Sequence, residues 1–319
     1  MAQHFLLSAA ARTLKLRDVY RLTDEAAHAA FVAIRFSENA GAPFCPDCGC
    51  TDPYAIPTRR KWKCRACGKQ FSATSGTIFA SRKMAFVDLL AAICIFVNCA
   101  KGISALQLSR DLDCQYKTAF VLAHKLREAM AKGNDDVHLD GTVEVDGAYF
   151  GGHVRPENRK VDRKDRRLAA NKGNDRRVVV VLRERGGRTL PFVVRREAEG
   201  AAIVRERVAL GSELHADEAP HWDELEMRYH AYRINHSEAF SWDGACTNQA
   251  ESYFARLRRA VTGQHHHVSK QYLYQYANEA AWREDHARVA NGAQHAAVLA
   301  SALGSPISRA WKGYWQRAA

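Results

Sequence analysis

Two pairs of cysteines near the start of the chain constrain its folding most tightly, because four thiolates can share one metal ion only where their backbone segments meet. Cys45 and Cys48 form one C-x2-C pair, and Cys64 and Cys67 form a second pair after fifteen intervening residues. This spacing is typical of a structural zinc site with four thiolate ligands. Two alternatives remain open at this point: Cys50 in place of Cys48 as a ligand, and a redox function for the pairs.

The sequence around the cysteines favours a zinc ribbon over residues 41–75. Trp62 and Phe71 lie close to the second pair and can supply a small apolar core for such a ribbon. Before it, within an N-terminal lead of residues 1–40, a helix is expected over residues 22–36 with Thr23 as its N-cap. We therefore expect the chain to begin with a helix that leads into a Zn²⁺-stabilised module.

The charge of the chain points to a polyanionic partner. The 319 residues carry a formal net charge of +12 and have a pI near 9.4, which favours DNA as the partner and gives no indication of a membrane surface. Within the ribbon, Lys63 and Arg65 are expected to contact DNA phosphate, and a solvated surface is the alternative. The basic residues of the ribbon are Arg59, Arg60, Lys61, Lys63, Arg65 and Lys69.

Neither a secretory leader nor a membrane span is expected. The N-terminus has no basic leader, and its apolar run is too short for a signal peptide. The most apolar segment, residues 85–100, contains Asp88 and Asn98 and falls short of the about 20 residues that a spanning helix needs. We expect a cytoplasmic protein, whose nine cysteines are metal ligands or core residues rather than disulfides.

Residues 76–132 are expected to form a helical DNA-binding region. A buried helix is expected over residues 81–98, followed by a short helix over residues 103–112 and a third that begins near Tyr116. The break at residues 113–114 indicates a helix-turn-helix, although such a pair is often only scaffold. The polar residues expected to touch DNA from this region are Lys117, Thr118, Lys125 and Arg127.

The second half of the chain alternates between strand-like and helix-like segments after a boundary at residues 133–137. Three strands, a helix, a strand, a helix, a strand and a helix are expected at residues 143–150, 178–182, 190–194, 198–210, 213–216, 221–229 and 232–235 and from 247 onward. Asp146 lies on the first strand and Asp217 at the end of the fourth. Glu251 falls in the first turn of the last helix, with Thr247 as its N-cap.

This order of elements, with acids at these three places, resembles the ribonuclease-H-like core of DDE transposases and integrases. Over residues 30–290 the chain resembles the insertion-sequence family numbered fifteen ninety-five. The motifs that carry the resemblance are V-E-V-D-G-A-Y-F-G-G, I-N-H-S-E, T-N-Q-A-E-S-Y-F-A-R-L-R-R and V-T-G-Q-H-H-H-V-S. It implies an α/β fold, with a mixed sheet and flanking helices over residues 138–262 and a helical region over residues 263–319.

The resemblance also implies an activity. A DDE transposase hydrolyses phosphodiesters at the ends of its mobile element and uses the 3' hydroxyls to attack target DNA. Asp146, Asp217 and Glu251 would be its catalytic acids and would hold two Mg²⁺ or Mn²⁺ ions, which suits an in-line displacement at phosphorus. The alternatives are a non-catalytic DNA-binding regulator derived from a transposase, and a simple metal-dependent nuclease.

Several polar residues around the acids carry further expectations. Glu144 points to the same face of its strand as Asp146 and is expected to have a flanking structural role. Glu218 is a possible competitor of Asp217 as a ligand. His236 is expected either at DNA or beside the ligands, or as a buried core histidine. The residues of the last helix expected at DNA are Asn248, Arg258 and Arg259.

The remaining expectations concern the loops and the assembly. The insert at residues 153–177 holds ten Lys or Arg against four acids and is expected to grip the DNA backbone, with a solvated loop as the alternative. The histidines of residues 265–267 are not expected to bind metal. Trp311 and Trp315 are expected to pack on the core or on another subunit. Because pairing two element ends requires at least two subunits, we expect a homodimer or a larger assembly on DNA.

Overall fold

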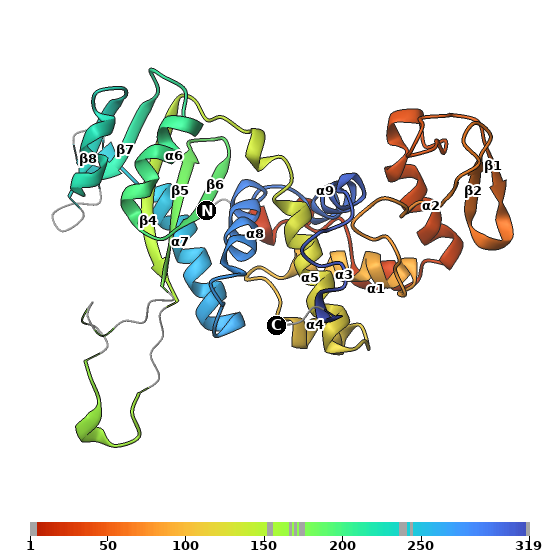
Figure 1. Cartoon of the computed structure of the whole chain (residues 1–319), viewed down its shortest axis with the longest axis horizontal. Helices are drawn as coiled ribbons and strands as arrows, with labels where there is room; N and C mark the ends of the chain where they lie inside the picture. The colour runs from red at the N-terminus through yellow and green to blue at the C-terminus, as the bar shows by residue number, and fades with distance from the viewer. Residues whose placement is uncertain are drawn as a thin grey trace. The chain divides into compact units, whose positions relative to one another are not determined.

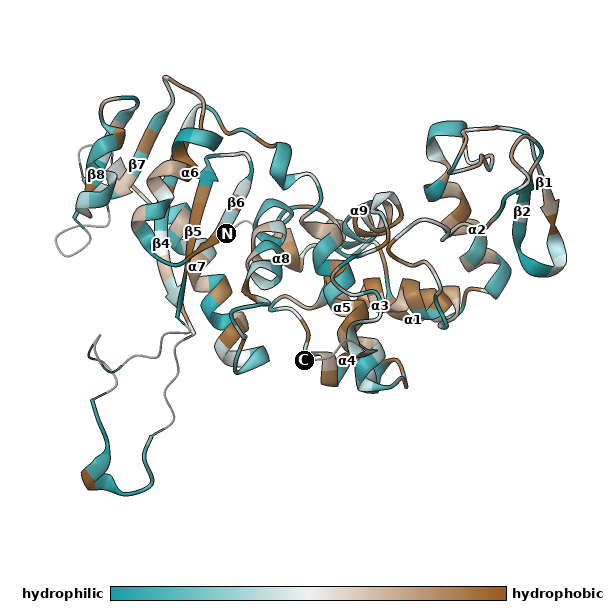
Figure 2. Ribbon diagram, in the orientation of Figure 1, coloured by the Kyte–Doolittle hydropathy of each residue, from teal (hydrophilic) through white to brown (hydrophobic). Residues whose placement is uncertain are grey.

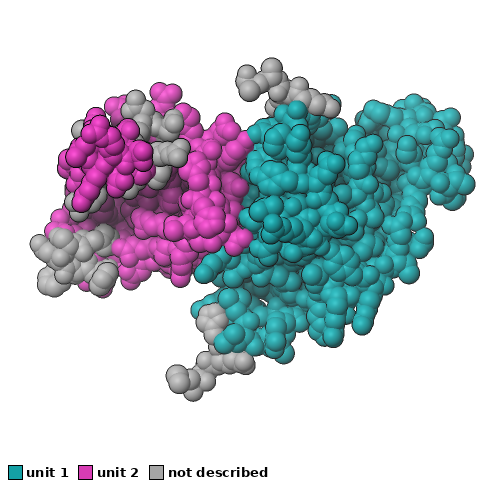
Figure 3. Space-filling model, turned by 90° about the horizontal axis from the view of Figure 1, so that it is seen from below, with its two compact units in different colours: residues 1–132, 286–319 teal, residues 133–285 magenta. Residues whose placement is uncertain are grey.

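The structure is a computed structural model and describes residues 5–151, 156–165, 168, 171, 176–235, 241–242 and 245–316. His236 and parts of the basic insert at residues 153–177 lie outside the described residues. The chain divides into two compact units, one formed by residues 1–132 and 286–319 and the other by residues 133–285 (Figure 3). Among the described helices, none combines the length and the apolar character needed to cross a bilayer.

A five-stranded mixed sheet organises the unit of residues 133–285 (Figure 1). Its strands are β4 (Thr142–Phe150), β5 (Arg177–Glu184), β6 (Thr189–Val194), β7 (Glu213–Asp217) and β8 (His230–Ile234). The spatial order is β6-β5-β4-β7-β8, in which β5 runs antiparallel to its neighbours β4 and β6, and β7 and β8 run parallel to β4. The expected ribonuclease-H-like mixed sheet is confirmed.

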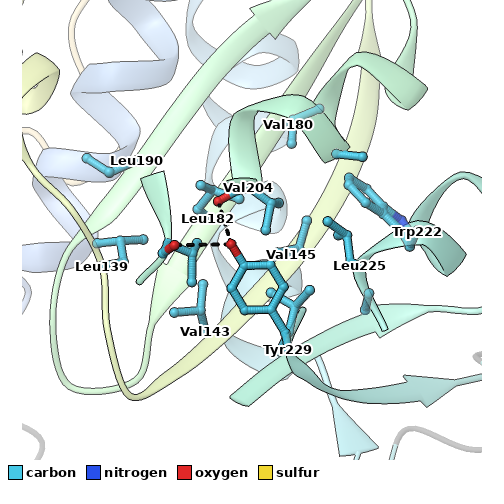
Figure 4. Packing of buried hydrophobic residues seen from close by; sticks show 14 of the residues in the cluster. Leu139, Val143, Val145, Val180, Leu182, Leu190, Val204, Trp222, Leu225 and Tyr229 are labelled. Atoms are coloured by element: carbon cyan, nitrogen blue, oxygen red, sulfur yellow. Dashed lines mark hydrogen bonds between the residues drawn. The ribbon is translucent and has the colours of Figure 1, made fainter. Parts of the chain in front are cut away.

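Helices cover both faces of this sheet because successive strand residues point to opposite sides. On one face, Val143 and Val145 pack with α6 (Gly200–Arg207) and with the 3-10 helix η9 (Pro220–Leu225). Figure 4 shows this cluster, in which the Tyr229 hydroxyl donates to the carbonyls of Val204 and Val208. The opposite face is covered by α7 (Asn248–Ala260) and α8 (Leu273–Asp285).

Within the unit of residues 133–285, two of the expected helices differ in their type or bounds, and in the other unit the helix expected over residues 81–98 begins at Phe86. The helix expected over residues 198–210 is shorter, because a 3-10 turn, η8 (Glu197–Glu199), precedes α6. The helix expected over residues 221–229 is the 3-10 helix η9, which begins at Pro220 and ends at Leu225. Short 3-10 segments are common connectors where a chain must turn between packed elements.

The zinc-ribbon region is a three-stranded antiparallel sheet in the order β1-β2-β3. Its strands are β1 (Pro53–Ile56), β2 (Lys61–Cys64) and β3 (Gln70–Phe71). It follows α2 (Asp24–Arg35), whose N-terminus is capped by the Thr23 hydroxyl, which accepts from the Ala26 N–H at 3.2 Å. The expected helix and its cap are thus present.

The unit of residues 1–132 and 286–319 also contains α1 (Leu16–Tyr20) and four further helices. They are α3 (Phe86–Asn98), α4 (Ala105–Asp111), α5 (Tyr116–Met130) and α9 (Asn291–Gly304). Most side chains of α3 are buried, in keeping with its apolar sequence (Figure 2). α4 and α5 pack together across the short link of residues 112–115, which is the expected helix-turn-helix arrangement.

Short elements complete the described chain. The strands β9 (Ser241–Trp242) and β10 (Ala245–Cys246) pair with each other, and a π-helical turn, η10 (Val261–His265), follows α7. The remaining 3-10 turns are η1 (Phe5–Leu7), η2 (Ala9–Ala11), η3 (Ser37–Asn39), η4 (Pro57–Arg59), η5 (Asn134–Asp136), η6 (Lys160–Asp162) and η11 (Tyr314–Gln316).

Candidate active site and zinc cluster

The parallel pairing of β4 and β7 brings two of the predicted acids together. Thr142 pairs with Glu213, and the same register continued along the strands sets Asp146 beside Asp217. Neighbouring strands lie about 4.8 Å apart, so carboxylates on adjacent strands can share a ligand site. One oxygen each from Asp146, Asp217 and Glu197 all lie within 4.8 Å of one another.

Glu197 is a site residue that the sequence pattern does not predict. It lies in η8, shortly after β6. At such a position an acid is usually interpreted as a residue that stabilises the N-terminus of a helix. Two glycines make its position possible. A Cβ atom at Gly147 would lie 2.6 Å from Cδ of Glu197, and one at Gly200 would lie 2.7 Å from the Trp222 ring. Because both glycines lack that atom, Glu197 of η8 can lie against β4, and the start of α6 can pack against Trp222 of η9.

The clustered carboxylates perturb one another. Burial, together with the negative charges of Asp217, Glu197 and Glu251, raises the pKa of Asp146 from its ordinary 3.8 to about 7, although the Gly147 N–H donates to it. Burial and the charge of Asp217 also raise the pKa of Glu197. Burial and mutual repulsion therefore disfavour the charged forms of Asp146 and Glu197, and a bound cation would offset both effects.

Glu251 lies in the first turn of α7, outside the cluster of three oxygens. It is near enough for its charge to contribute to the raised pKa of Asp146. Glu218 is exposed and also lies outside the cluster. The assignment of Glu251 as the third ligand stays a prediction, and Glu197 is the acid that lies next to the two aspartates.

Glu144 anchors the helix that carries Glu251. Its carboxylate is fully buried and accepts from the backbone N–H groups of Gln249 at 2.7 Å and Ala250 at 3.0 Å. It also pairs with Nε of Arg185 at 2.8 Å. The carboxylate thus caps α7, the task that the sequence suggested for Thr247. The strand that carries Asp146 therefore also fixes the start of α7.

Hydrogen bonds from Arg233 hold the chain that follows Asp217 in place. Arg233 of β8 donates from Nε to the Asp217 carbonyl at 2.7 Å and from a terminal nitrogen to the Ala219 carbonyl at 2.8 Å. The Asp217 carboxylate accepts from the Ala219 N–H at 3.2 Å. These contacts hold the turn at the end of β7, and with it the backbone from which the Asp217 carboxylate extends.

The chemistry of the donors fits a divalent metal ion such as Mg²⁺. Hard cations of this kind prefer carboxylate oxygens, and the three clustered side chains offer only such oxygens. Burial and the neighbouring acids raise the pKa of Asp146, and a cation bound beside it would offset that cost of charging the carboxylate. The arrangement can therefore hold a metal ion where the end of β7 lies beside β4.

The four cysteines of the ribbon form a second cluster. The Sγ atoms of Cys45 and Cys67 are 3.7 Å apart, and those of Cys48 and Cys64 are 3.5 Å apart. All four sulfurs lie within 4.8 Å of one another, and Cys50 is not among them. The set of four thiolates fits a tetrahedral structural zinc site.

Two matching turns create this cluster. The Gly49 N–H donates to the Cys45 carbonyl at 2.9 Å, and the Gly68 N–H donates to the Cys64 carbonyl at 3.1 Å. Both glycines have a positive φ, +76° and +73°, a conformation that glycine adopts without steric cost. Each C-x2-C pair thus folds its two sulfurs to one side of a tight turn.

The predicted DNA contacts of the ribbon and of α5 are accessible to different degrees. Lys63 is half-buried and Arg65 is exposed, and both lie over the ring of Tyr54. Lys117 and Thr118 are exposed in the first turn of α5. On α7, Asn248, Arg258 and Arg259 are exposed as well. These DNA contacts stay predictions.

Arg127 requires a correction. Its side chain is only 1% exposed, donates to the Ile103 carbonyl at 3.4 Å and lies 5.3 Å from the centre of the Phe96 ring. Arg127 therefore holds α3 and α5 together, and its burial removes it from the predicted DNA contacts. The sequence of α5 does not reveal this, because the pattern of neighbouring residues does not distinguish a buried arginine from an exposed one.

The sequence matches two known protein families, in the ranges that contain the acidic cluster and the cysteine cluster. Residues 138–285 match a family described as the ISXO2-like transposase domain, and residues 22–70 match a transposase zinc-ribbon domain. No curated protein and no solved structure matches the chain. The first matched range contains the acidic cluster and Glu251, and the second contains all four clustered cysteines. The zinc-ribbon match and the cysteine cluster together indicate structural Zn²⁺.

Proposed function

Because the chain belongs to the DDE transposases of the insertion-sequence family numbered fifteen ninety-five, we propose that it cuts DNA at the ends of its own element and joins the freed 3' hydroxyls to target DNA. The observation that carries this proposal is the meeting of Asp146, Asp217 and Glu197 beside the carboxyl end of β7. Holding three carboxylates from separate elements together costs free energy through their mutual repulsion, and a bound cation would offset that cost.

In this proposal, Asp146, Asp217 and Glu197 hold divalent metal ions, and Glu251 completes the ligand set from α7. Bound Mg²⁺ or Mn²⁺ would activate the attacking oxygen and stabilise the leaving oxygen in an in-line displacement. The chain's own contribution is to position the ligands. The shared register of β4 and β7 sets the two aspartates side by side, and Glu144 sets the start of the helix that carries Glu251.

The exposed cations of α7 have a supporting role in this proposal. Arg258 and Arg259 lie two turns after Glu251 on the same helix, and Asn248 lies one turn before it. Guanidinium groups bind phosphate oxygens, so these side chains are suited to hold the DNA backbone next to the acids. Because two element ends must be joined in one reaction, we also propose that the active form has at least two subunits.

A plasmid that carries the element with its own flanking DNA tests the proposal. The wild-type chain, incubated with Mg²⁺ or Mn²⁺, is expected to nick the DNA at the element ends and to produce joined products. The Asp146→Asn variant is expected to bind the same ends but to yield neither product. Tight binding without strand breakage by the wild type would instead support a DNA-binding regulator. Cutting without joining would support a nuclease.

A further inference from the structure

A pocket of about 340 Å³ opens beside the first turn of α5, within the unit of residues 1–132 and 286–319. Three segments line it: the chain that leads into α3 together with Leu89 of that helix, one side of α5, and the chain that follows α9. Its volume is at the small end of the range of about 300–1,000 Å³ found for ligand sites. The acidic cluster belongs to the other unit, so this pocket is a separate feature.

The segment that follows α9 forms the aromatic wall of the pocket. The ring centroids of Trp311 and His124 are 4.4 Å apart, and Trp311 is buried. Tyr314 stacks on Phe120 with centroids 5.9 Å apart, and Trp315 meets Tyr314 edge-on at 5.2 Å. Trp315 nevertheless remains 46% exposed. The wall is therefore held in place by α5 and still offers an indole ring to a ligand.

Lysines line the same pocket. Lys83, Lys117 and Lys125 contribute to it, and no acid is found among its described lining residues. The Lys117 Nζ lies 5.2 Å from the centre of the Trp315 ring. Burial lowers the pKa of Lys125, an effect that the charge of Glu128 opposes. A ligand that brought negative charge would therefore be favoured here.

A nucleotide supplies both kinds of partner that the pocket offers. Its base is a flat ring that stacks on an aromatic side chain, and its phosphate pairs with an ammonium group. In a duplex both faces of each base are covered by neighbouring bases, so only an unpaired base can reach such a wall. We propose that this pocket binds an unpaired nucleotide of DNA, with its base against Trp315 and its phosphate beside Lys117.

The place of the pocket in the fold supports DNA as the ligand. Lys117 and Thr118 lie in the first turn of α5, the second helix of the helix-turn-helix pair. In such pairs, the N-terminal residues of the second helix contact DNA. A pocket at this end would therefore lie next to the bound DNA. The choice of DNA as the polyanion rests on the proposed transposase function.

The test uses the full chain and two probes that differ only in their bases. One is a short single strand that contains 2-aminopurine, and the other is the same strand with abasic sites in place of the bases. The wild type is expected to bind the base-containing strand about 5- to 100-fold more tightly and to quench the 2-aminopurine fluorescence. Equal affinities for the two strands would overturn the proposal.

Variants separate the aromatic from the cationic contribution. Trp315→Ala is expected to abolish the preference for bases, whereas Trp315→Phe retains most of it. Lys117→Gln is expected to weaken binding of both strands and to leave their ratio unchanged. Tyr20→Ala is the matched control, because Tyr20 has the same 46% exposure as Trp315 and lies outside the pocket lining. An unchanged preference in Trp315→Ala would also overturn the proposal.

The outcome is separable from that of the proposed function. If the wild type cuts duplex element ends in an Asp146-dependent manner but does not distinguish bases from abasic sites, only the pocket proposal fails. If it distinguishes them but leaves element ends intact, the transposase proposal fails and the pocket proposal survives. Thermal melting of each variant shows whether it is folded, and Trp315→Phe provides the readout if Trp315→Ala is not.

Discussion

The Glu197 carboxylate fills the space that a side chain at Gly147 would need: a Cβ atom there would lie 2.6 Å from Cδ of Glu197. Gly147 follows Asp146 directly on β4, while Glu197 arrives from the turn before α6. Because Gly147 has no side chain, an acid about fifty residues later in the chain can lie next to Asp146. The glycine thus admits a third carboxylate to the cluster.

Replacement of this glycine is expected to damage the site more than the fold. In Gly147→Ala the new methyl group displaces the flexible end of Glu197, so activity on element-end DNA should fall on the order of 100-fold while the melting temperature changes little. Gly263→Ala is the control, since a Cβ there meets nothing within 4 Å and its φ is not positive. Full activity in Gly147→Ala would show that the position of Glu197 is irrelevant to catalysis.

Glu197→Gln is expected to weaken Mn²⁺ binding by about tenfold or more, because it replaces one of the clustered carboxylates with a neutral amide. Isothermal titration calorimetry measures this directly. Glu218→Gln serves as the comparison: it removes the same charge next to Asp217 but outside the cluster, and its affinity should match that of the wild type. Equal losses in both variants would point to a general electrostatic effect.

Loss of the buried cap on α7 should be costly. Glu144→Ala leaves two backbone N–H groups without their acceptor and removes the carboxylate that pairs with Arg185, so the free energy of unfolding should drop by about 3–5 kcal/mol. Denaturant unfolding gives the value. The exposed Glu213→Ala should change stability by only about 0.5 kcal/mol. A similar small loss in Glu144→Ala would mean that α7 does not depend on this carboxylate.

Metal stabilisation should depend on pH through Asp146. The pKa of Asp146 is about 7 in the folded chain, above its ordinary value of 3.8. Proton binding at Asp146 therefore stabilises the metal-free fold at low pH. This stabilisation is lost as the pH rises from about 4 to about 7. A cation competes with that proton. The increase in melting temperature on adding Mn²⁺ should therefore grow as pH rises through 7, and Asp146→Asn should flatten the profile. A pH-independent shift in the wild type contradicts this.

Zinc content distinguishes the cysteines of the ribbon. Cys48→Ser should bind less than one Zn²⁺ per chain and destabilise the ribbon, because Cys48 is one of the four clustered sulfurs. Cys50→Ser should retain full zinc, since Cys50 lies outside that set. Zinc is measured by atomic absorption after dialysis. If Cys50→Ser lost zinc and Cys48→Ser retained it, Cys50 and not Cys48 would be the fourth zinc ligand.

Much of the site was predictable because some contacts are local or follow from element order. Each C-x2-C pair closes within a single turn, so the spacing alone indicates the zinc ribbon. The alternating strands around Asp146 and Asp217 indicate the mixed sheet, whose parallel pairing of β4 and β7 sets the two acids together. The helix that carries Glu251 was also predictable, because Thr247 marks its start, and Glu251 lies in its first turn as expected.

Other features depend on how distant segments pack, and no local pattern reports them. Glu197 reaches the cluster only because strand register and the space at Gly147 bring η8 to the sheet. Arg127 is a cation on a helix of mixed character, and its burial follows from packing against Phe96. The elements and the zinc ligands were readable from residue spacing because their contacts lie within a turn or a strand. The third carboxylate and the buried arginine required the tertiary structure, because their partners are far away along the chain.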